Sequence, residues 1–158
     1  MVAAIRLGVT GAIPDMQEPD FETVTASDFG RSLRGLGVNL LCRDVPAMAG
    51  FLQTVFGLGV HRLGPDFAIV THDGAVFQLH SDASFAAHPL HGLLPESPPR
   101  GAGVQLYLFG VDPDAAAGRA GAAGGLIVEL PADKPHGLRE ATILAPDGHA
   151  FSPAVACR

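Results

Sequence analysis

Hydrophobic and polar residues follow a pattern that predicts two similar halves. In the first half, an apolar run at residues 37–42 precedes residues 45–56, where apolar side chains recur at helical spacing. Short strands are predicted at 60–63, 67–70 and 75–80, and Asp73-Gly74 between the last two is typical of a hairpin turn. The pattern predicts the order β-α-β-β-β.

The second half repeats this order. A strand is predicted at 104–109, an Ala-rich helix from Asp112 to about residue 123, and a strand at 126–130. After a loop at 131–136, Pro146-Asp147-Gly148 separates two final strands, because proline, aspartate and glycine each favour a tight turn. The alignment of helix starts, helix ends and turns indicates an internal repeat.

Capping residues mark the two helices at equal separations. Asp44 and Asp112 are suited to accept from free N–H groups at a helix start, while Gly57 and Gly125 mark the ends. One βαβββ unit leaves an apolar sheet face uncovered, so two units are expected to associate. We therefore predict an α+β fold in which two βαβββ modules form a curved mixed sheet with a concave cleft and outer helices.

The predicted organisation has four parts. Residues 1–33 form an N-terminal arm of mixed character, which has a polar, proline-interrupted stretch at 13–20 and a short helical turn near Ser27-Asp28-Phe29-Gly30. Residues 34–82 form the first module, 83–100 a proline-rich linker, and 101–156 the second module.

Composition and charge argue against nucleic-acid and membrane partners. The chain has 158 residues, 47% hydrophobic residues and a net charge of −6, without a Lys/Arg-rich stripe, so we expect no nucleic-acid partner. No apolar stretch approaches the roughly 20 residues of a membrane span, so we expect no membrane partner and a cytoplasmic protein. Heavy use of Ala, Gly and Arg suggests a bacterial source. Cys42 lies in an apolar run and is expected to be buried, and we expect no disulfide with Cys157.

These features resemble a known group of proteins. The features are the βαβββ repeat, residues 44–59, the segment 134–140 and Pro146-Asp147-Gly148-His149. Together they resemble the vicinal oxygen chelate superfamily, which includes glyoxalase I, extradiol dioxygenases, fosfomycin-resistance enzymes and bleomycin-resistance proteins. The resemblance covers about residues 34–156 and departs from the usual pattern at Ala145, where an aspartate is common. It implies the glyoxalase/bleomycin-resistance/dioxygenase fold and, together with the open edge strands of small sheets, a homodimer.

The resemblance also implies where a metal would be held. Metal-dependent members carry His, Glu or sometimes Gln at one position of four strands, and the matching positions here are Gly37, Gln78, Gln105 and Ser152. Neutral amides, a hydroxyl and a glycine do not compensate a divalent ion for its lost hydration. A register shift of two adds only one good ligand, His80. We therefore expect no metal and no other cofactor.

Alternation along the strands predicts the polar lining of the cleft. The candidate ligand-binding residues on the strands are Asn39, Gln78, His80, Gln105 and Tyr107. His136 is placed to close over the entrance, and one of the neighbours Arg139 and Glu140 faces the cleft, with Glu140 the candidate.

The leading hypothesis is a metal-free protein of the glyoxalase/bleomycin-resistance type that binds a small organic ligand. Whether the chain is an enzyme stays open at this point. The alternatives are a metal-dependent lyase, isomerase or dioxygenase, a metal-free catalyst that uses His80, and a structural module whose cleft is collapsed; no catalytic residue is assigned.

Overall fold

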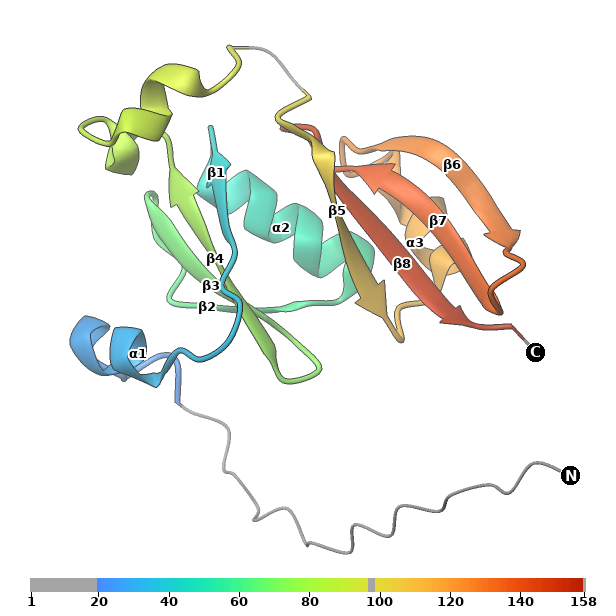
Figure 1. Ribbon diagram of the computed structural model, residues 1–158, viewed down its shortest axis with the longest axis horizontal. Helices are drawn as coiled ribbons and strands as arrows, with labels where there is room; N and C mark the ends of the chain where they lie inside the picture. Colours follow the sequence, from blue (N-terminus) through green and yellow to red (C-terminus); the bar gives the residue numbers. More distant parts are fainter. Residues whose placement is uncertain (1–19, 97–98, 158) are drawn as a thin grey trace, which may run out of the picture.

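The computed structural model describes residues 20–96 and 99–157 (Figure 1), so most of the predicted N-terminal arm lies outside the described residues. The described elements are, in order, α1 (Ala26–Ser32), β1 (Asn39–Cys42), α2 (Val45–Phe56), β2 (Gly59–His61), β3 (Phe67–His72), β4 (Ala75–Ser81), the 3-10 helices η1 (Ala83–Phe85) and η2 (Pro89–Leu93), β5 (Gly101–Phe109), α3 (Pro113–Ala120), β6 (Leu126–Asp133), β7 (Leu138–Leu144) and β8 (His149–Ala156).

Two four-stranded sheets contain all of the described strands. Sheet A has the order β1-β4-β3-β2 and sheet B the order β5-β8-β7-β6. In each sheet the first pair is parallel and the other pairs are antiparallel. The predicted α+β fold with two βαβββ modules is confirmed, although hydrogen bonding divides the expected curved sheet in two. Figure 1 shows β1 and β5 at the inner edges of the two sheets and β6 at the outer edge.

Local capping explains where the helices begin and end. Asp44 accepts a hydrogen bond from the Ala47 N–H at 2.8 Å, and α2 ends at Gly57, whose φ of 72° is in the left-handed region. Asp112 caps α3 in the same way. α3 ends at Ala120, earlier than predicted, because the chain turns before the positive φ of Gly124.

β6 is the element that differs most from the prediction. It extends to Asp133, through Pro131, where a loop was expected. An edge strand tolerates proline because the missing N–H removes no inner ladder bond. Register shifts between Ile127 and Ala132 accommodate the irregular pairing with β7.

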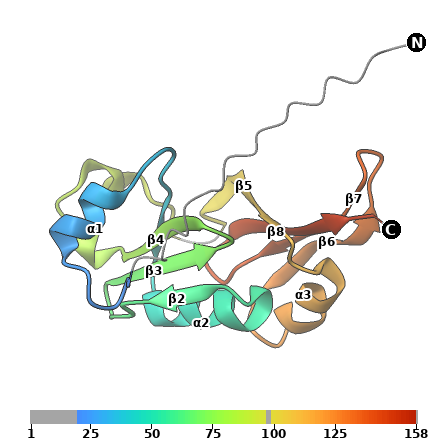
Figure 2. The same ribbon diagram turned by 90° about the horizontal axis from the view of Figure 1, so that it is seen from below.

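The main core lies between the sheets and the helices. Figure 2 shows α2 and α3 on the same side of the two sheets. The predicted apolar face of α2 is buried throughout, and its members are Val45, Met48, Phe51, Leu52, Val55 and Phe56. Phe151 of β8 is fully buried against Phe56, with ring centroids 5.4 Å apart, so the core joins both modules.

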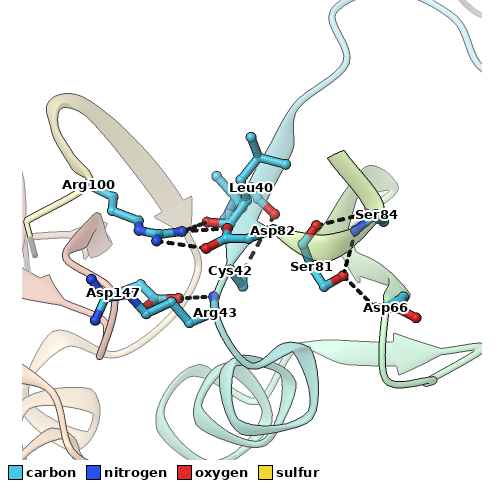
Figure 3. Close-up of polar contacts among 10 residues, drawn as sticks. Leu40, Cys42, Arg43, Asp66, Ser81, Asp82, Ser84, Arg100 and Asp147 are labelled. Carbon is cyan, nitrogen blue, oxygen red and sulfur yellow. Dashed lines mark hydrogen bonds and ion pairs between the residues drawn. The ribbon is translucent and has the colours of Figure 1, made fainter. Parts of the chain in front are cut away.

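Polar contacts join the modules where their inner edges meet, a region we call the junction (Figure 3). The Arg100 side chain is 5% exposed and donates to both carboxylate oxygens of Asp82, at 2.6 and 2.8 Å. These hydrogen bonds hold the pKa of Asp82 below its usual range. The Asp147 carboxylate accepts from the Arg43 backbone N–H at 2.9 Å. The predicted turn Pro146-Asp147-Gly148 therefore also connects the two halves.

We call the face of each sheet that is turned away from α2 and α3 its distal face. On sheet A, this face is covered by residues 20–32, with α1 lying across it (Figure 2). Phe21 and Phe29 form a small buried cluster with Ile69 of β3, and Phe67 and Val76 pack against it. The predicted helical turn at 27–30 lies within α1. This cover leaves the distal face of sheet B as the more open of the two.

Two further findings concern expectations from composition. No helix among residues 20–96 and 99–157 is long and apolar enough to cross a membrane. Both cysteines are free, and Cys42 is fully buried, as predicted. Burial raises the pKa of the Cys42 thiol to about 12, which keeps it protonated and unsuited to nucleophilic chemistry.

Candidate functional site

The distal face of sheet B carries a continuous set of polar side chains. Tyr107 of β5 lies opposite Ser152 of β8 in the strand register, and Glu140 of β7 lies opposite Ala154 of β8. Leu106, Leu108, Ile143 and Phe151 point to the opposite face, where they join the helix-covered core. Alternation thus places five polar residues on one face: Gln105, Tyr107, Glu140, Thr142 and Ser152. We call this set the polar face.

One end of the polar face is a group of neutral hydrogen-bonding side chains. The Gln105 Nε2 donates to Ser152 Oγ at 2.6 Å and lies 3.4 Å from Thr142 Oγ1. Ser152 is fully buried, whereas Gln105 is exposed. The Gln105 amide therefore covers the Ser152 hydroxyl and can offer its own carbonyl oxygen to a ligand.

Glu140 lies at the centre of a second group. Its Oε1 is 3.5 Å from the Tyr107 hydroxyl, and its Oε2 is 3.3 Å from His136 Nε2. Glu140 is 7% exposed, whereas the His136 side chain is 55% exposed on the loop before β7. Three of the predicted residues, Tyr107, His136 and Glu140, are therefore brought together by the fold.

Arg139, the neighbour of Glu140, points to the other side of β7. Its guanidinium contacts both carboxylate oxygens of Asp114, at 2.6 and 2.7 Å, and Asp133 at 3.0 Å. The prediction that Arg139 and Glu140 face opposite ways is consistent with these contacts, and Glu140 is the one on the polar face.

A charged pair borders the polar face at β6. Lys134 forms an ion pair with Glu129, which also accepts from Thr142 Oγ1 at 3.4 Å. The hydrogen bond to Glu129 raises the pKa of Lys134, with smaller contributions from Glu140 and Tyr107. Lys134 is therefore a fixed cation close to the Glu140 group.

Two exposed aromatic rings stand beside the polar residues. Tyr107 and Phe109 of β5 stack with centroids 5.4 Å apart and an interplanar angle of 17°. Their exposures are 37% and 57%, so both rings are accessible from solvent. We call this pair the aromatic ledge.

The predicted residues in the first module are held in sheet A. Asn39 and Gln78 are register partners on β1 and β4. The His80 ring lies between Phe67 and Phe85, with centroid distances of 5.0 and 5.2 Å. Burial lowers the pKa of His80, so it is neutral near pH 7. None of these three forms a hydrogen bond with the polar face among the described residues.

The four positions at which the resemblance places metal ligands do not fit a divalent ion. Gly37 precedes β1 and has no donor side chain, and Gln105 and Ser152 hydrogen-bond to each other. Gln78, on β4, supplies only a neutral amide. In the described part of the chain, no group of three or more His, Cys, Asp or Glu side chains is arranged to hold a metal.

Several residues of this face were not predicted as ligand-binding. Thr142 follows Glu140 at strand spacing and Phe109 follows Tyr107 in the same way, so alternation could have identified both. Glu129 and Lys134 could not have been found by alternation, because β6 is irregular where it pairs with β7.

Two cavities lie elsewhere in the molecule. A groove of about 600 Å³ between α2 and α3 is lined by Gly50, Thr54, Gly118 and Arg119, among others. A cavity of about 350 Å³ lies beside Asp112, Arg139 and Cys157. The groove between α2 and α3 is therefore a second surface, separate from the polar face, at which a small molecule can bind.

Comparison with known proteins identifies the family of this chain. A family model described as Glyoxalase/Bleomycin resistance protein/Dioxygenase superfamily matches residues 36–152. No curated protein sequence matches the chain.

Several solved structures share the fold of this chain. A glyoxalase/bleomycin resistance protein/dioxygenase family enzyme from Burkholderia phytofirmans PsJN has a TM-score of 0.63 and 22% identity, covering 77% of this chain and 97% of its own. A glyoxalase-related enzyme from Fulvimarina pelagi has a TM-score of 0.62 and 20% identity over 77% and 87% of the two chains. TioX from Micromonospora sp. ML1 has a TM-score of 0.56 and 22% identity over 79% and 100%. At these identities the likeness shows the fold alone.

Proposed function

The chain belongs to the Glyoxalase/Bleomycin resistance protein/Dioxygenase superfamily, and from that membership we propose that it binds a small organic ligand on the polar face of sheet B without a metal ion. The observation that carries this proposal is the gathering of Gln105, Tyr107, Glu140, Thr142 and Ser152 on one sheet face beside the aromatic ledge. A few oriented polar groups next to apolar rings are typical of small-molecule sites.

The covered half of the molecule supports placing the ligand on sheet B. Residues 20–32 occupy the distal face of sheet A, where Phe21 and Phe29 pack on Ile69. A ligand there would have to displace a buried cluster, whereas the polar face requires no such displacement. We therefore propose that the ligand binds on sheet B alone.

The donor chemistry favours binding without a metal. Gly37, Gln78, Gln105 and Ser152 together offer no charged or imidazole ligand. A metal-dependent lyase, isomerase or dioxygenase would need such ligands to hold its ion. Metal-free catalysis by His80 draws less support, because its ring lies between two phenylalanines.

A ligand screen tests the binding proposal. Thermal stability is measured with a panel of metabolites, and a true ligand at a hundredfold excess over its Kd stabilises by about 2.7 kcal/mol. Backbone chemical shifts then locate it, with changes expected on β5, β7 and β8. Gln105→Arg is expected to abolish binding, while Thr54→Arg, in the groove between α2 and α3, leaves it intact. Stabilisation by no metabolite, or shifts confined to that groove, would overturn the proposal.

Metal content is a separate test. Protein purified without chelators and then dialysed is expected to contain less than about 0.1 equivalent of any transition metal. A stoichiometric content of Ni, Zn, Fe or Mn that survives dialysis would show that the proposal of metal-free binding is wrong.

We further propose that the protein is a cytoplasmic homodimer. The outer edge of sheet B supports the dimer, because β6 exposes Leu126, Val128 and Leu130 by 58–71%. An edge strand with exposed apolar side chains favours association with another surface.

A further inference from the structure

Glu140 is a buried carboxylate with weak partners. It is 7% exposed, and its two contacts, to Tyr107 at 3.5 Å and to His136 at 3.3 Å, are both longer than ordinary charge-assisted hydrogen bonds. A carboxylate has about four acceptor positions, and removing it from water is costly unless they are satisfied. Glu140 therefore has unused capacity to accept hydrogen bonds from a cation.

The permanent cations nearby are engaged elsewhere. Lys134 pairs with Glu129, and Arg139 pairs with Asp114 and Asp133 on the other side of β7. Within the described residues, His136 is the one basic side chain within 4 Å of the Glu140 carboxylate. Its ring is more than half exposed on a loop, so a ligand could take its place at Oε2.

The aromatic ledge adjoins this carboxylate. The Tyr107 hydroxyl faces Glu140, and the Tyr107 ring stacks on Phe109. Aromatic faces attract both flat apolar groups and organic cations. The stacking surface and the negative charge therefore lie side by side.

We propose that Glu140, Tyr107 and Phe109 form a subsite for a protonated amine that is joined to a flat apolar group. The ammonium donates to Glu140, and the apolar group lies on the ledge. This inference rests on the proposed ligand-binding function and names the chemical class that this part of the polar face selects.

Tyr107 supplies a direct readout, because it is the only tyrosine in a chain without tryptophan. Its fluorescence is titrated at pH 7 with 2-phenylethylamine, which is protonated, and with neutral 2-phenylethanol, which has the same ring. The amine is expected to bind at least tenfold more tightly. Phe109→Leu is expected to weaken both probes, since it removes half of the ledge.

Two charge variants test the role of the carboxylate. Glu140→Gln is expected to remove the tenfold preference for the amine, while Glu96→Gln, an exposed site in the connector that changes net charge equally, preserves it. Because Glu140 is buried, circular dichroism and the melting temperature are used to check that Glu140→Gln is folded. If Glu140→Gln is unfolded, Tyr107→Leu is titrated with the amine instead, with amide chemical shifts as the readout. Tyr107→Leu is expected to lose amine binding.

Three outcomes would overturn the inference. These are equal binding of the two probes, equal loss of the preference in the two charge variants, and failure of the amine to bind. If metabolites still bind the polar face in the screen, the proposed function stands while the cation subsite fails. If ligands bind only in the groove between α2 and α3, both fail.

Discussion

Removing the ring of Phe29 tests whether residues 20–32 are a separable cover of sheet A. Phe29 is 5% exposed and packs edge-to-face against Phe21 and Phe67, with centroid distances of 6.1 and 6.5 Å. Truncating a buried phenylalanine to alanine typically costs about 3–5 kcal/mol. We therefore expect Phe29→Ala to remove most of the free energy that holds the cover in place.

The rest of the segment cannot compensate for that loss. α1 has seven residues, too few to be stable in isolation. Fixing the backbone of each residue costs about 1–2 kcal/mol, and the remaining polar anchors are few. The Arg62 guanidinium donates to the Val24 carbonyl at 2.8 Å, and Glu22 contacts the Arg62 backbone and His61. The cover should detach locally while the main core, which contains none of these residues, stays folded.

Hydrogen exchange measures this local opening. In Phe29→Ala, the amides of α1 are expected to exchange about a hundredfold faster or at the unprotected rate, since each 1.4 kcal/mol is a factor of ten. Amides of α2 and β8 should change by less than about threefold. Leu36→Ala is the control, because Leu36 is 91% exposed and its truncation should leave every region unchanged.

Two results would refute the reasoning. Unchanged exchange in α1 would show that Phe29 does not hold the cover. Faster exchange in α2 and β8, in parallel with α1, would show that the cover is an integral part of the cooperative core rather than a separate unit.

The other predictions concern the junction, pH and assembly. Arg100→Ala is expected to lower the free energy of unfolding in urea by about 3 kcal/mol, because loss of the guanidinium, whose side chain is 5% exposed, leaves the Asp82 carboxylate unpaired. Arg31→Ala, at an ion pair whose side chains are 77% and 62% exposed, should lower it far less, and equal effects would contradict the argument. Burial lowers the pKa of His149 below 6.5, so the unfolded chain binds more protons and stability should fall as pH decreases through 6.5. His149→Gln should reduce that slope and leave the smaller dependence expected from His80, whose pKa burial also lowers; an unchanged slope would show that His149 does not contribute. Sedimentation of the wild-type protein is expected at twice the monomer mass, and a monomeric wild type would refute the dimer. Val128→Lys is expected to dissociate the dimer. Val104→Lys should not, although Val104 is 62% exposed and Val128 is 58% exposed.

The elements were predictable because their signals are local. Asp44 and Gly57 define α2 through their own backbone chemistry, and both were identified as its caps. The Asp73-Gly74 and Asp147-Gly148 turns likewise depend on residues adjacent in the chain. β6 was harder to predict, since its extension through Pro131 depends on its place at the edge of sheet B.

The candidate site was predictable only in part. Alternation along β5 identified Gln105 and Tyr107, and the Tyr107–Glu140–His136 contacts join two predicted strands and a loop. His80 illustrates the limit of this reasoning. Its strand position indicated a cleft residue, but Phe85 of the connector covers its ring, and no local pattern specifies where a connector packs.

The sequence by itself determined the two βαβββ modules, the capped helices, the buried face of α2 and the unsuitable donor set at the expected metal positions. The modules, the capped helices and the buried face of α2 follow from spacing, capping and side-chain chemistry, which act within a few residues. The expected metal positions come from the resemblance to the vicinal oxygen chelate superfamily, and side-chain chemistry then shows that their donors are unsuitable. Only the tertiary structure decided that residues 20–32 cover sheet A and that the distal face of sheet B stays open. It also decided that Glu140 is buried between Tyr107 and His136. Those outcomes depend on which surfaces meet after the chain has folded, and contacts between distant segments leave no periodic signal in the sequence.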